Sequence, residues 1–346
     1  MIRFDSDYTQ GAHPRILDAL VRTNMEQTCA YAEDGYSEEA RALIRNACEA
    51  PDADVHFLVG GTGTNTTVIA AALRPWEGVI CPETGHINVH ESGAIESSGH
   101  KVVALPQRDG KLPAETAEQF CAAYHADGTK EHMVKPGMIY ISQPTEVGTL
   151  YSAAELTALK AVCERYGMFL FVDGARLGYG LAADGSDVTL PLLAKTADAF
   201  TVGGTKVGAL FGEAVVISNA AMKPGFRYMI KQRGNMLAKG RLLGVQFREM
   251  FLDGLYFEMG AHAIEAARRL KKIFADAGYP FAADSPTNQQ FPILPDAVLE
   301  KLSTDFAYSY WNRYDENSSV VRFCTSWATT DEELDALEAA LPTLAG

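Results

Sequence analysis

Between residues 37 and 218 the sequence alternates short apolar segments with longer segments in which apolar residues recur every three or four positions. The short segments are typical of buried strands, and the longer spacing is typical of helices that cover them. The predicted strands are residues 55–59, 78–81, 102–105, 138–142, 168–172, 199–202 and 214–218. The predicted helices are residues 37–50, 64–73, 89–97, 113–126, 153–166 and 188–195, with Ser37 as the N-cap of the first. This alternation predicts an α/β fold, with helices on both faces of a mostly parallel sheet.

The pattern changes after about residue 236. A long helical segment at 237–277 is interrupted near Asp253 and Gly254. Short strands follow at 290–294, 306–311 and 320–325, and then a helix at 331–341. This order predicts a smaller α+β domain. Because 346 residues exceed one ordinary core, we expect an N-terminal segment (1–15) that contributes to the active site, a large domain (16–236) and a small C-terminal domain (237–346).

Composition excludes several classes of partner. The formal net charge is −14 and the isoelectric point is near 5.0, so we expect no nucleic-acid or anionic-membrane surface. No apolar segment reaches the roughly 18 residues that a membrane-spanning helix needs, and the N-terminus lacks an apolar signal segment. The six cysteines show no metal-binding spacing, so we expect buried thiols, no metal site and a cytoplasmic location.

Two of the predicted strands run into charged residues. The strand at 168–172 is followed by Asp173 and Arg176, and the strand at 199–202 is followed by two glycines and Lys206. One predicted helix separates these strands, so a right-handed crossover can bring their carboxyl ends together. A carboxylate at that edge needs a partner, because burying it unpaired is costly. A structural alternative is that Asp173 caps the next turn or pairs with Arg176.

A glycine-rich turn, Gly60-Gly61-Thr62-Gly63, joins the first predicted strand to the following helix. Free backbone N–H groups and the helix dipole favour phosphate at such a turn. An amine, a buried carboxylate and a phosphate site are the parts that pyridoxal-5′-phosphate (PLP) chemistry needs. We therefore expect Lys206 to hold PLP as a Schiff base and Asp173 to keep its ring nitrogen protonated.

The same turn has a dinucleotide-binding interpretation. Gly61 and Gly63 imitate the first half of a GxGxxG motif, and Glu83 lies where a ribose-binding acid would be. Thr66 occupies the third glycine position, which weakens this match. A dinucleotide site also has no use for an acid and a lysine at two neighbouring strand ends.

His86 and His90 follow the strand at 78–81 with the spacing of some zinc ligands. They form HxxxHE rather than HExxH, and no third ligand is evident, so we do not expect a metal. A histidine just after a strand end can stack on a cofactor ring. We expect this role for His86 and an ordinary helical position for His90.

Taken together, these segments resemble the low-specificity L-threonine aldolases, which are fold-type I, aspartate-aminotransferase-like PLP enzymes. The resemblance runs from Ser6-Asp7 to Phe323-Cys324-Thr325-Ser326-Trp327. The matching segments between are Gly61-Thr62, Glu83-Thr84-Gly85-His86, Thr145-Glu146-Val147-Gly148-Thr149, Val172-Asp173-Gly174-Ala175-Arg176 and Gly203-Gly204-Thr205-Lys206. The resemblance implies the type I architecture, with a mostly parallel seven-stranded sheet and a smaller α+β C-terminal domain.

The resemblance also implies roles for the matched residues. Lys206 is the Schiff-base lysine, Asp173 the partner of the ring nitrogen, and His86 the residue stacked on the ring. The other implied cofactor contacts are Gly61, Thr62, Thr205 and Arg176. Ser6 and Arg322, with Arg176, grip the substrate carboxylate, for which the planar fork of arginine is suited. For Arg322 the structural alternative is a solvated strand residue.

A homodimer or homotetramer with active sites at the dimer interface is a further implication. Tyr31 resembles a residue that reaches into the neighbour's site. Lys239 or Arg233 resembles one that reaches the neighbour's phosphate.

The sequence departs from better-known family members near Glu146, where those members carry a histidine thought to sense the β-hydroxyl. Glu146 is therefore a candidate base for the hydroxyl proton, or a ligand for His86 or a water.

The implied activity is retro-aldol cleavage of L-threonine or L-allo-threonine to glycine and acetaldehyde by an aldehyde-lyase. Another PLP reaction, such as β-elimination, racemisation or transamination, would use the same Lys206 and Asp173. A non-enzymatic or dinucleotide-binding protein is the alternative from another class.

Overall fold

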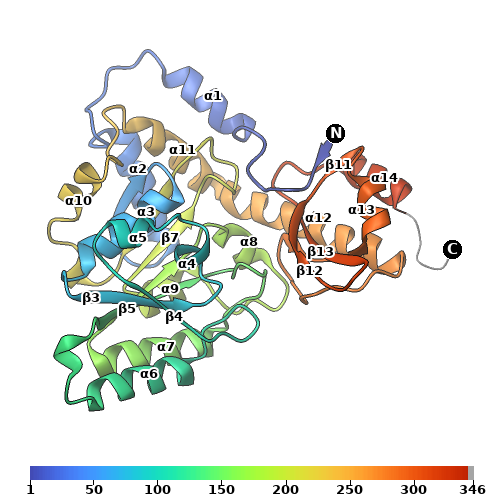
Figure 1. The fold of residues 1–346 in the computed structure, drawn as a ribbon. Helices are drawn as coiled ribbons and strands as arrows, with labels where there is room; N and C mark the ends of the chain where they lie inside the picture. The colour runs from blue at the N-terminus through green and yellow to red at the C-terminus, as the bar shows by residue number, and fades with distance from the viewer. Residues whose placement is uncertain (342–346) are drawn as a thin grey trace.

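The computed structural model describes residues 1–341 and is built around a seven-stranded sheet (Figure 1). Its strands are β2 (Asp54–Leu58), β3 (Glu77–Pro82), β4 (Val102–Leu105), β5 (Lys135–Ser142), β6 (Phe169–Asp173), β7 (Ala199–Gly203) and β8 (Glu213–Ile217). The strand order is β2-β8-β7-β6-β5-β3-β4. β8 pairs antiparallel with β2 and β7, and the other pairs are parallel. The predicted α/β fold with a mostly parallel sheet is confirmed.

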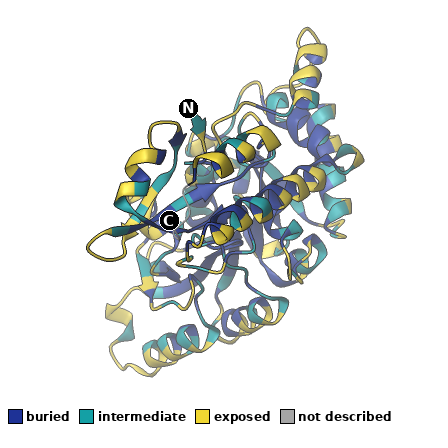
Figure 2. Cartoon of the chain, turned by 90° about the vertical axis from the view of Figure 1, so that its right-hand side faces the viewer, coloured by how far each residue is buried: buried dark blue, intermediate teal, exposed yellow. Residues whose placement is uncertain are grey.

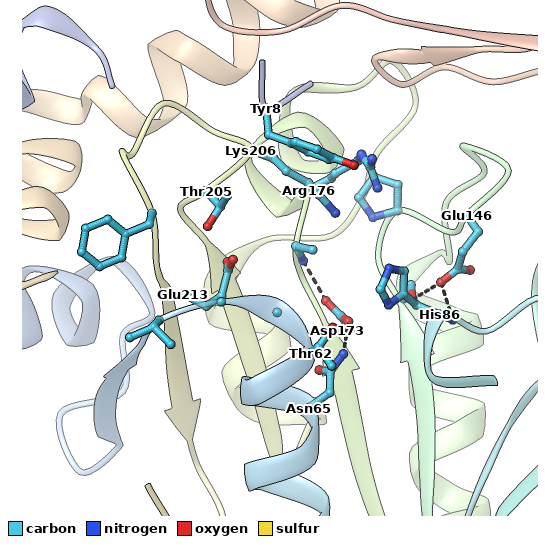
Figure 3. Close-up of a pocket in the computed structure, with 17 residues that line it drawn as sticks. Tyr8, Thr62, Asn65, His86, Glu146, Asp173, Arg176, Thr205, Lys206 and Glu213 are labelled. Carbon is cyan, nitrogen blue, oxygen red and sulfur yellow. Dashed lines mark hydrogen bonds between the residues drawn. The ribbon is translucent and has the colours of Figure 1, made fainter. Parts of the chain in front are cut away.

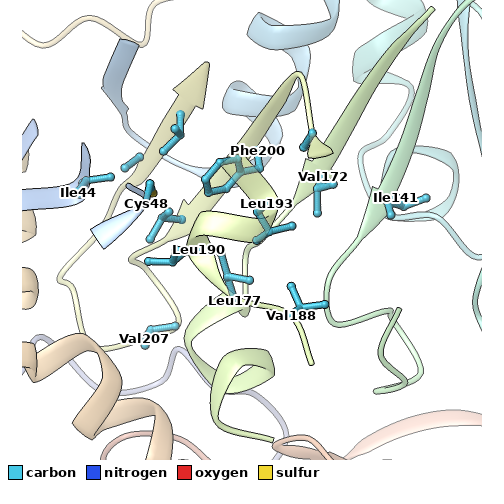
Figure 4. Packing of buried hydrophobic residues seen from close by; sticks show 14 of the residues in the cluster. Ile44, Cys48, Ile141, Val172, Leu177, Val188, Leu190, Leu193, Phe200 and Val207 are labelled. Atoms are coloured by element: carbon cyan, nitrogen blue, oxygen red, sulfur yellow. The ribbon is translucent and has the colours of Figure 1, made fainter. Parts of the chain in front are cut away.

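Helices bury both faces of this sheet, because alternate residues of each strand point to opposite sides. On one face, Val172 and Phe200 pack in the same cluster as Leu193 of α9 (Leu190–Thr196) (Figure 4). On the other face, Phe171 packs in a cluster with Phe226 of α10 (Phe226–Gln232). In Figure 2 the strands are largely buried, and the helices present an exposed side to solvent.

The remaining helices of this part are α1 (Pro14–Thr23), α2 (Gly35–Ala47), α3 (Gly61–Ala72), α4 (His86–Val89), α5 (Ala94–Ser97), α6 (Ala114–Ala126), α7 (Ala153–Tyr166), α8 (Leu177–Ala182) and α11 (Arg241–Phe251). Three short 3-10 segments lie at Lys130–His132, Ala220–Met222 and Leu252–Gly254.

The C-terminal part of the chain forms a second, smaller hydrophobic core beside the sheet domain (Figure 1). Its elements are α12 (Leu255–Asp276), β9 (Gln289–Gln290), β10 (Ile293–Pro295), α13 (Asp296–Leu302), β11 (Phe306–Ala307), β12 (Ser309–Arg313), β13 (Ser318–Cys324) and α14 (Asp331–Ala340). The N-terminus joins this core, because β1 (Ile2–Arg3) pairs with β11 and Phe4 packs beside Phe323. The division into 1–15, 16–236 and 237–346 stays a prediction.

Several local predictions are corrected by the structure. The N-cap of α2 is Asp34 rather than Ser37, and its carboxylate accepts the Ser37 backbone N–H at 2.9 Å. The helix expected at 64–73 begins at Gly61, and the helix expected at 89–97 is the separate pair α4 and α5. Cys29 is exposed, whereas the other five cysteines are buried as expected.

The break expected near Asp253 and Gly254 is confirmed, since both residues have positive φ, 57° and 78°. No helix within residues 1–341 is long and apolar enough to cross a membrane.

Candidate active site

The carboxyl ends of the parallel strands open into a cavity of about 320 Å³ (Figure 3). β6 and β7 are neighbours in parallel register, with Val172 opposite Phe200. Asp173 ends β6, and Lys206 follows β7 by three positions. The lining includes eight of the predicted site residues, namely Gly61, Thr62, His86, Glu146, Asp173, Arg176, Thr205 and Lys206.

Asp173 is a buried carboxylate surrounded by donors. Its Oδ2 accepts hydrogen bonds from Tyr140 Oη at 2.6 Å and Asn65 Nδ2 at 2.8 Å, and its Oδ1 accepts the Ala175 backbone N–H at 2.9 Å. Burial alone would raise the pKa of Asp173. The charge of His86 and the hydrogen bonds from Tyr140 and Asn65 outweigh burial, and the pKa lies below its ordinary value. Asp173 is therefore held as an anion.

Lys206 lines the same cavity without an ion-pair or hydrogen-bond partner for Nζ among residues 1–341. Its amine lies 5.9 Å from the centre of the Tyr8 ring. Burial and the Arg176 guanidinium lower the pKa of Lys206, although Asp7 and Asp173 act in the opposite direction. A lysine with a lowered pKa is a better nucleophile near neutral pH.

The glycine turn forms the first turn of α3, with Gly60 as its N-cap. A Cβ added at Gly60 or Gly61 would meet no atom within 4 Å, so both glycines leave the cavity open beside the helix N-terminus. Thr62 and Thr205 line the cavity as well. Backbone N–H groups at the start of a helix and two threonine side chains suit a phosphate.

His86 is held by two carboxylates. Its Nδ1 lies 2.7 Å from Oε1 of the buried Glu91, and its backbone N–H donates to Oε1 of Glu146 at 3.0 Å. Ser142 Oγ donates to the same Glu146 oxygen at 2.5 Å. Glu146 is therefore a ligand of the His86 backbone and not of its ring. Its Oε2 is buried and has no hydrogen-bond partner within the described residues, and burial raises the pKa of Glu146.

Arg322 lies in an adjoining cavity of about 710 Å³, which shares Tyr8, His86, Glu146, Arg176 and Lys206 with the first. Its guanidinium donates to Gln289 Oε1 at 3.2 Å and to the Asp5 carbonyl at 3.2 Å. Nε of Arg322 is buried without a partner, and no carboxylate within residues 1–341 pairs with this arginine. Ser6 lines neither cavity, and its Oγ is buried without a hydrogen-bond partner within the described residues. A guanidinium that bonds only neutral acceptors and has no paired carboxylate suits a carboxylate ligand.

Arg176 has a partner that the sequence did not reveal. Its Nε and Nη2 bind the two oxygens of Asp7, at 2.5 and 3.1 Å. Asn288 Nδ2 donates to Asp7 at 2.9 Å as well. The pairing of Arg176 with Asp173, considered as a structural alternative, is not formed. The guanidinium is therefore fixed at the cavity wall by the N-terminal segment.

Tyr31, Lys239 and Arg233 do not line either cavity of their own chain. Tyr31 is 40% exposed and Lys231 lies 4.7 Å from its ring centre. Their expected role in a neighbour's site stays a prediction.

Several residues at or beside the site were not predicted from the sequence, namely Asp7, Tyr8, Asn65, Glu91, Tyr140, Ser142 and Glu213. Two of them carried a usable signal. Asn65 lies four positions after Gly61 and so shares its helix face. Glu213 is an acid at the start of the apolar strand β8. It lines the cavity, and burial raises its pKa to about 7.

A buried acid, an unpaired lysine and an open helix N-terminus at the sheet edge define a PLP-binding site of fold type I. The model of the beta-eliminating lyase family matches residues 4–294, and the chain belongs to this family. It is 31% identical to the low specificity L-threonine aldolase of Pseudomonas sp. (strain NCIMB 10558), over 97% of this chain and 96% of the relative. It is 30% identical to the protein of that name from Pseudomonas aeruginosa, over 97% and 95%.

Solved structures agree with this kinship. A threonine aldolase of Leishmania major is 44% identical, with a TM-score of 0.95 over 98% of both chains. An aspartate aminotransferase of Thermus thermophilus, 14% identical, shares the fold with a TM-score of 0.71 over 98% of this chain and 90% of its own. The resemblance to the threonine aldolases and the type I fold are thereby confirmed, and so is the expectation of PLP as cofactor.

The residues present fit PLP. Lys206 supplies a free amine, the glycine turn supplies open space for a phosphate, and Asp173 supplies a buried anion for a protonated ring nitrogen. The dinucleotide interpretation of the turn is set aside, because it leaves Lys206 and Asp173 unexplained.

Proposed function

We propose that this chain is an aldehyde-lyase that cleaves the Cα–Cβ bond of L-threonine, L-allo-threonine and related β-hydroxy-α-amino acids to glycine and an aldehyde. The observation that carries the proposal is the unpaired amine of Lys206 in one cavity with the buried anion of Asp173. When bound, PLP supplies the electron sink for the bonding pair of the cleaved bond.

The carboxylate of the substrate is bound by Arg322 and Ser6. Nε of Arg322 and Oγ of Ser6 are buried donors without acceptors within the described residues. The two residues are brought near each other because Arg322 donates to the carbonyl of Asp5, which precedes Ser6. Holding the carboxylate there fixes the orientation of the substrate and so selects which bond at Cα breaks. Arg176, fixed by Asp7, completes this wall of the cavity.

Glu146 accepts the proton of the β-hydroxyl. Oε1 is occupied by Ser142 and the His86 backbone, whereas Oε2 has no hydrogen-bond partner among the described residues. A general base works best with a pKa near the working pH, and burial raises the pKa of Glu146 in that direction. Loss of this proton accompanies cleavage of the Cα–Cβ bond, and a proton is returned to Cα of the product glycine.

The test is incubation of the PLP-loaded enzyme with L-threonine and L-allo-threonine, with assays for acetaldehyde, glycine and 2-oxobutyrate. Equal amounts of acetaldehyde and glycine are expected. Formation of 2-oxobutyrate without acetaldehyde would assign the chain to β-elimination instead.

We also propose a cytoplasmic homodimer or homotetramer, in which Tyr31 and either Lys239 or Arg233 reach the neighbour's site. Their absence from the cavities of their own chain supports this assignment. Mixing inactive Lys206→Ala and Tyr31→Ala subunits after mild dissociation should restore activity, since each mixed dimer then contains one intact site and one doubly altered site. No recovery in verified mixed dimers would contradict it.

A further inference from the structure

Asn65 and Glu91 connect His86 to Asp173 through buried hydrogen bonds. Asn65 Nδ2 donates to Glu91 Oε1 and to Asp173 Oδ2, each at 2.8 Å. The same oxygen of Glu91 lies 2.7 Å from Nδ1 of His86. Figure 3 shows His86, Asp173 and Asn65 at the same cavity. Two side chains thus link the candidate stacking residue to the candidate partner of the ring nitrogen.

The chemistry of the partners fixes the donors in this network. Ionised carboxylates only accept, so the amide group of Asn65 must direct its two N–H groups to Glu91 and Asp173. Oδ1 of Asn65 is buried without a partner, so what the residue contributes is its two donors. By the same reasoning Nδ1 of His86 donates to Glu91, which orients the imidazole ring.

The carboxylate of Glu91 is buried at a cost in free energy that only a role for its charge would explain. Its side chain is fully buried, whereas that of His86 is 32% exposed. Oε2 of Glu91 is buried and has no hydrogen-bond partner within the described residues. Burying a carboxylate with half of its acceptors unused is costly, and a neutral side chain would fill the same volume without that cost.

We propose that Glu91 is a positioning residue for the His86 ring, and that the Asn65 amide holds the Glu91 carboxylate in place. This inference rests on the proposed function, in which His86 and Asp173 contact PLP. Without the Glu91 carboxylate, the imidazole loses its orienting acceptor and PLP binds less tightly.

A double-mutant cycle tests whether Glu91 acts through His86. The dissociation constant of PLP is measured by absorbance titration of apoprotein for the wild type, Glu91→Gln, His86→Phe and the double variant. Glu96→Gln is the matched control, since Glu96 is exposed on the neighbouring helix α5. Circular dichroism and thermal midpoints report whether each variant folds. If Glu91→Gln does not fold, Glu91→Asp, which keeps the charge but withdraws it from His86, replaces it.

We expect Glu91→Gln to weaken PLP binding about 10-fold, the size typical of a lost charge-assisted hydrogen bond. The double variant should then bind PLP no more weakly than His86→Phe alone, and Glu96→Gln should match the wild type. If the losses of the two single variants multiply in the double variant, Glu91 acts independently of His86 and the inference fails. Aldehyde release by the wild type is assayed in parallel. Its absence would count against the proposed function, while the binding cycle would still decide the role of Glu91.

Discussion

Arg176 and Asp7 form a buried two-point ion pair that joins the N-terminal segment to the end of strand β6. The side chain of Asp7 is fully buried and that of Arg176 is 13% exposed. Burial would raise the pKa of Asp7, but Arg176 and Lys206 outweigh burial and lower it. The pair therefore anchors residues 5–8 across the cavity, where Asp5 meets Arg322 and Tyr8 meets Lys206.

Asp7→Asn should reduce the free energy of unfolding by about 3–5 kcal/mol at pH 7, because it leaves the Arg176 charge buried without its partner. A carboxyl with a lowered folded-state pKa stabilises the fold above its unfolded pKa, and this contribution is lost as pH falls through the folded value. In urea unfolding, the difference in the free energy of unfolding between the variant and the wild type should therefore become smaller at acid pH.

Asp276→Asn is the control, because its pair with Lys272 is exposed and screened by solvent, so its loss should change the free energy of unfolding far less. Equal effects of the two substitutions would contradict a stabilising role for the Asp7–Arg176 pair.

Glu146→Gln should lower kcat about 100-fold while PLP affinity stays close to that of the wild type, since the amide cannot accept the hydroxyl proton. The base must be ionised, so wild-type kcat should rise with pH through the raised pKa of Glu146. This rising limb should be missing from the profile of the variant. An unchanged limb in Glu146→Gln would assign the base to another group.

Arg322→Lys should raise KM for threonine about 10-fold or more, with a smaller change in kcat. The ammonium of lysine cannot reproduce the planar two-point contact with a carboxylate. Arg313→Lys, on an exposed stretch of β12, serves as the control. A KM for Arg322→Lys equal to that of the control would show that this arginine does not bind the substrate.

Asp173→Asn should lower kcat about 100-fold or more, because the amide carries no charge to keep the ring nitrogen protonated. The visible absorbance of bound PLP should shift in the same variant, which separates an effect on the cofactor from simple unfolding. If Asp173→Asn kept both the absorbance and the kcat of the wild type, Asp173 would have no role in the mechanism.

The fold and the positions of Asp173 and Lys206 could be predicted because they follow from the periodicity of the strands. Asp173 and Lys206 are each carried by the end of a buried strand, and the right-handed crossover makes those ends neighbours. The partners of these residues depend on tertiary contacts that no periodicity encodes. Asp7 meets Arg176 from 169 positions away in the chain, and Glu91 meets Asn65 from the turn between α4 and α5.

Errors at the boundaries of elements explain other omissions. Predicting α3 to begin at residue 64 instead of Gly61 hid the fact that Asn65 lies one turn along the helix from the glycine turn. Predicting β8 to begin at residue 214 left Glu213 in a loop, although it is the first residue of that strand and lines the cavity.

The central claim is that Lys206 holds PLP opposite Asp173. Borohydride reduction of PLP-loaded enzyme, followed by proteolysis and mass spectrometry of the peptides, tests it most directly. We predict a phosphopyridoxyl adduct on the peptide that contains Lys206, and none on the corresponding peptide of Lys206→Ala. An adduct confined to another lysine, or no adduct on protein that binds PLP, would contradict the account.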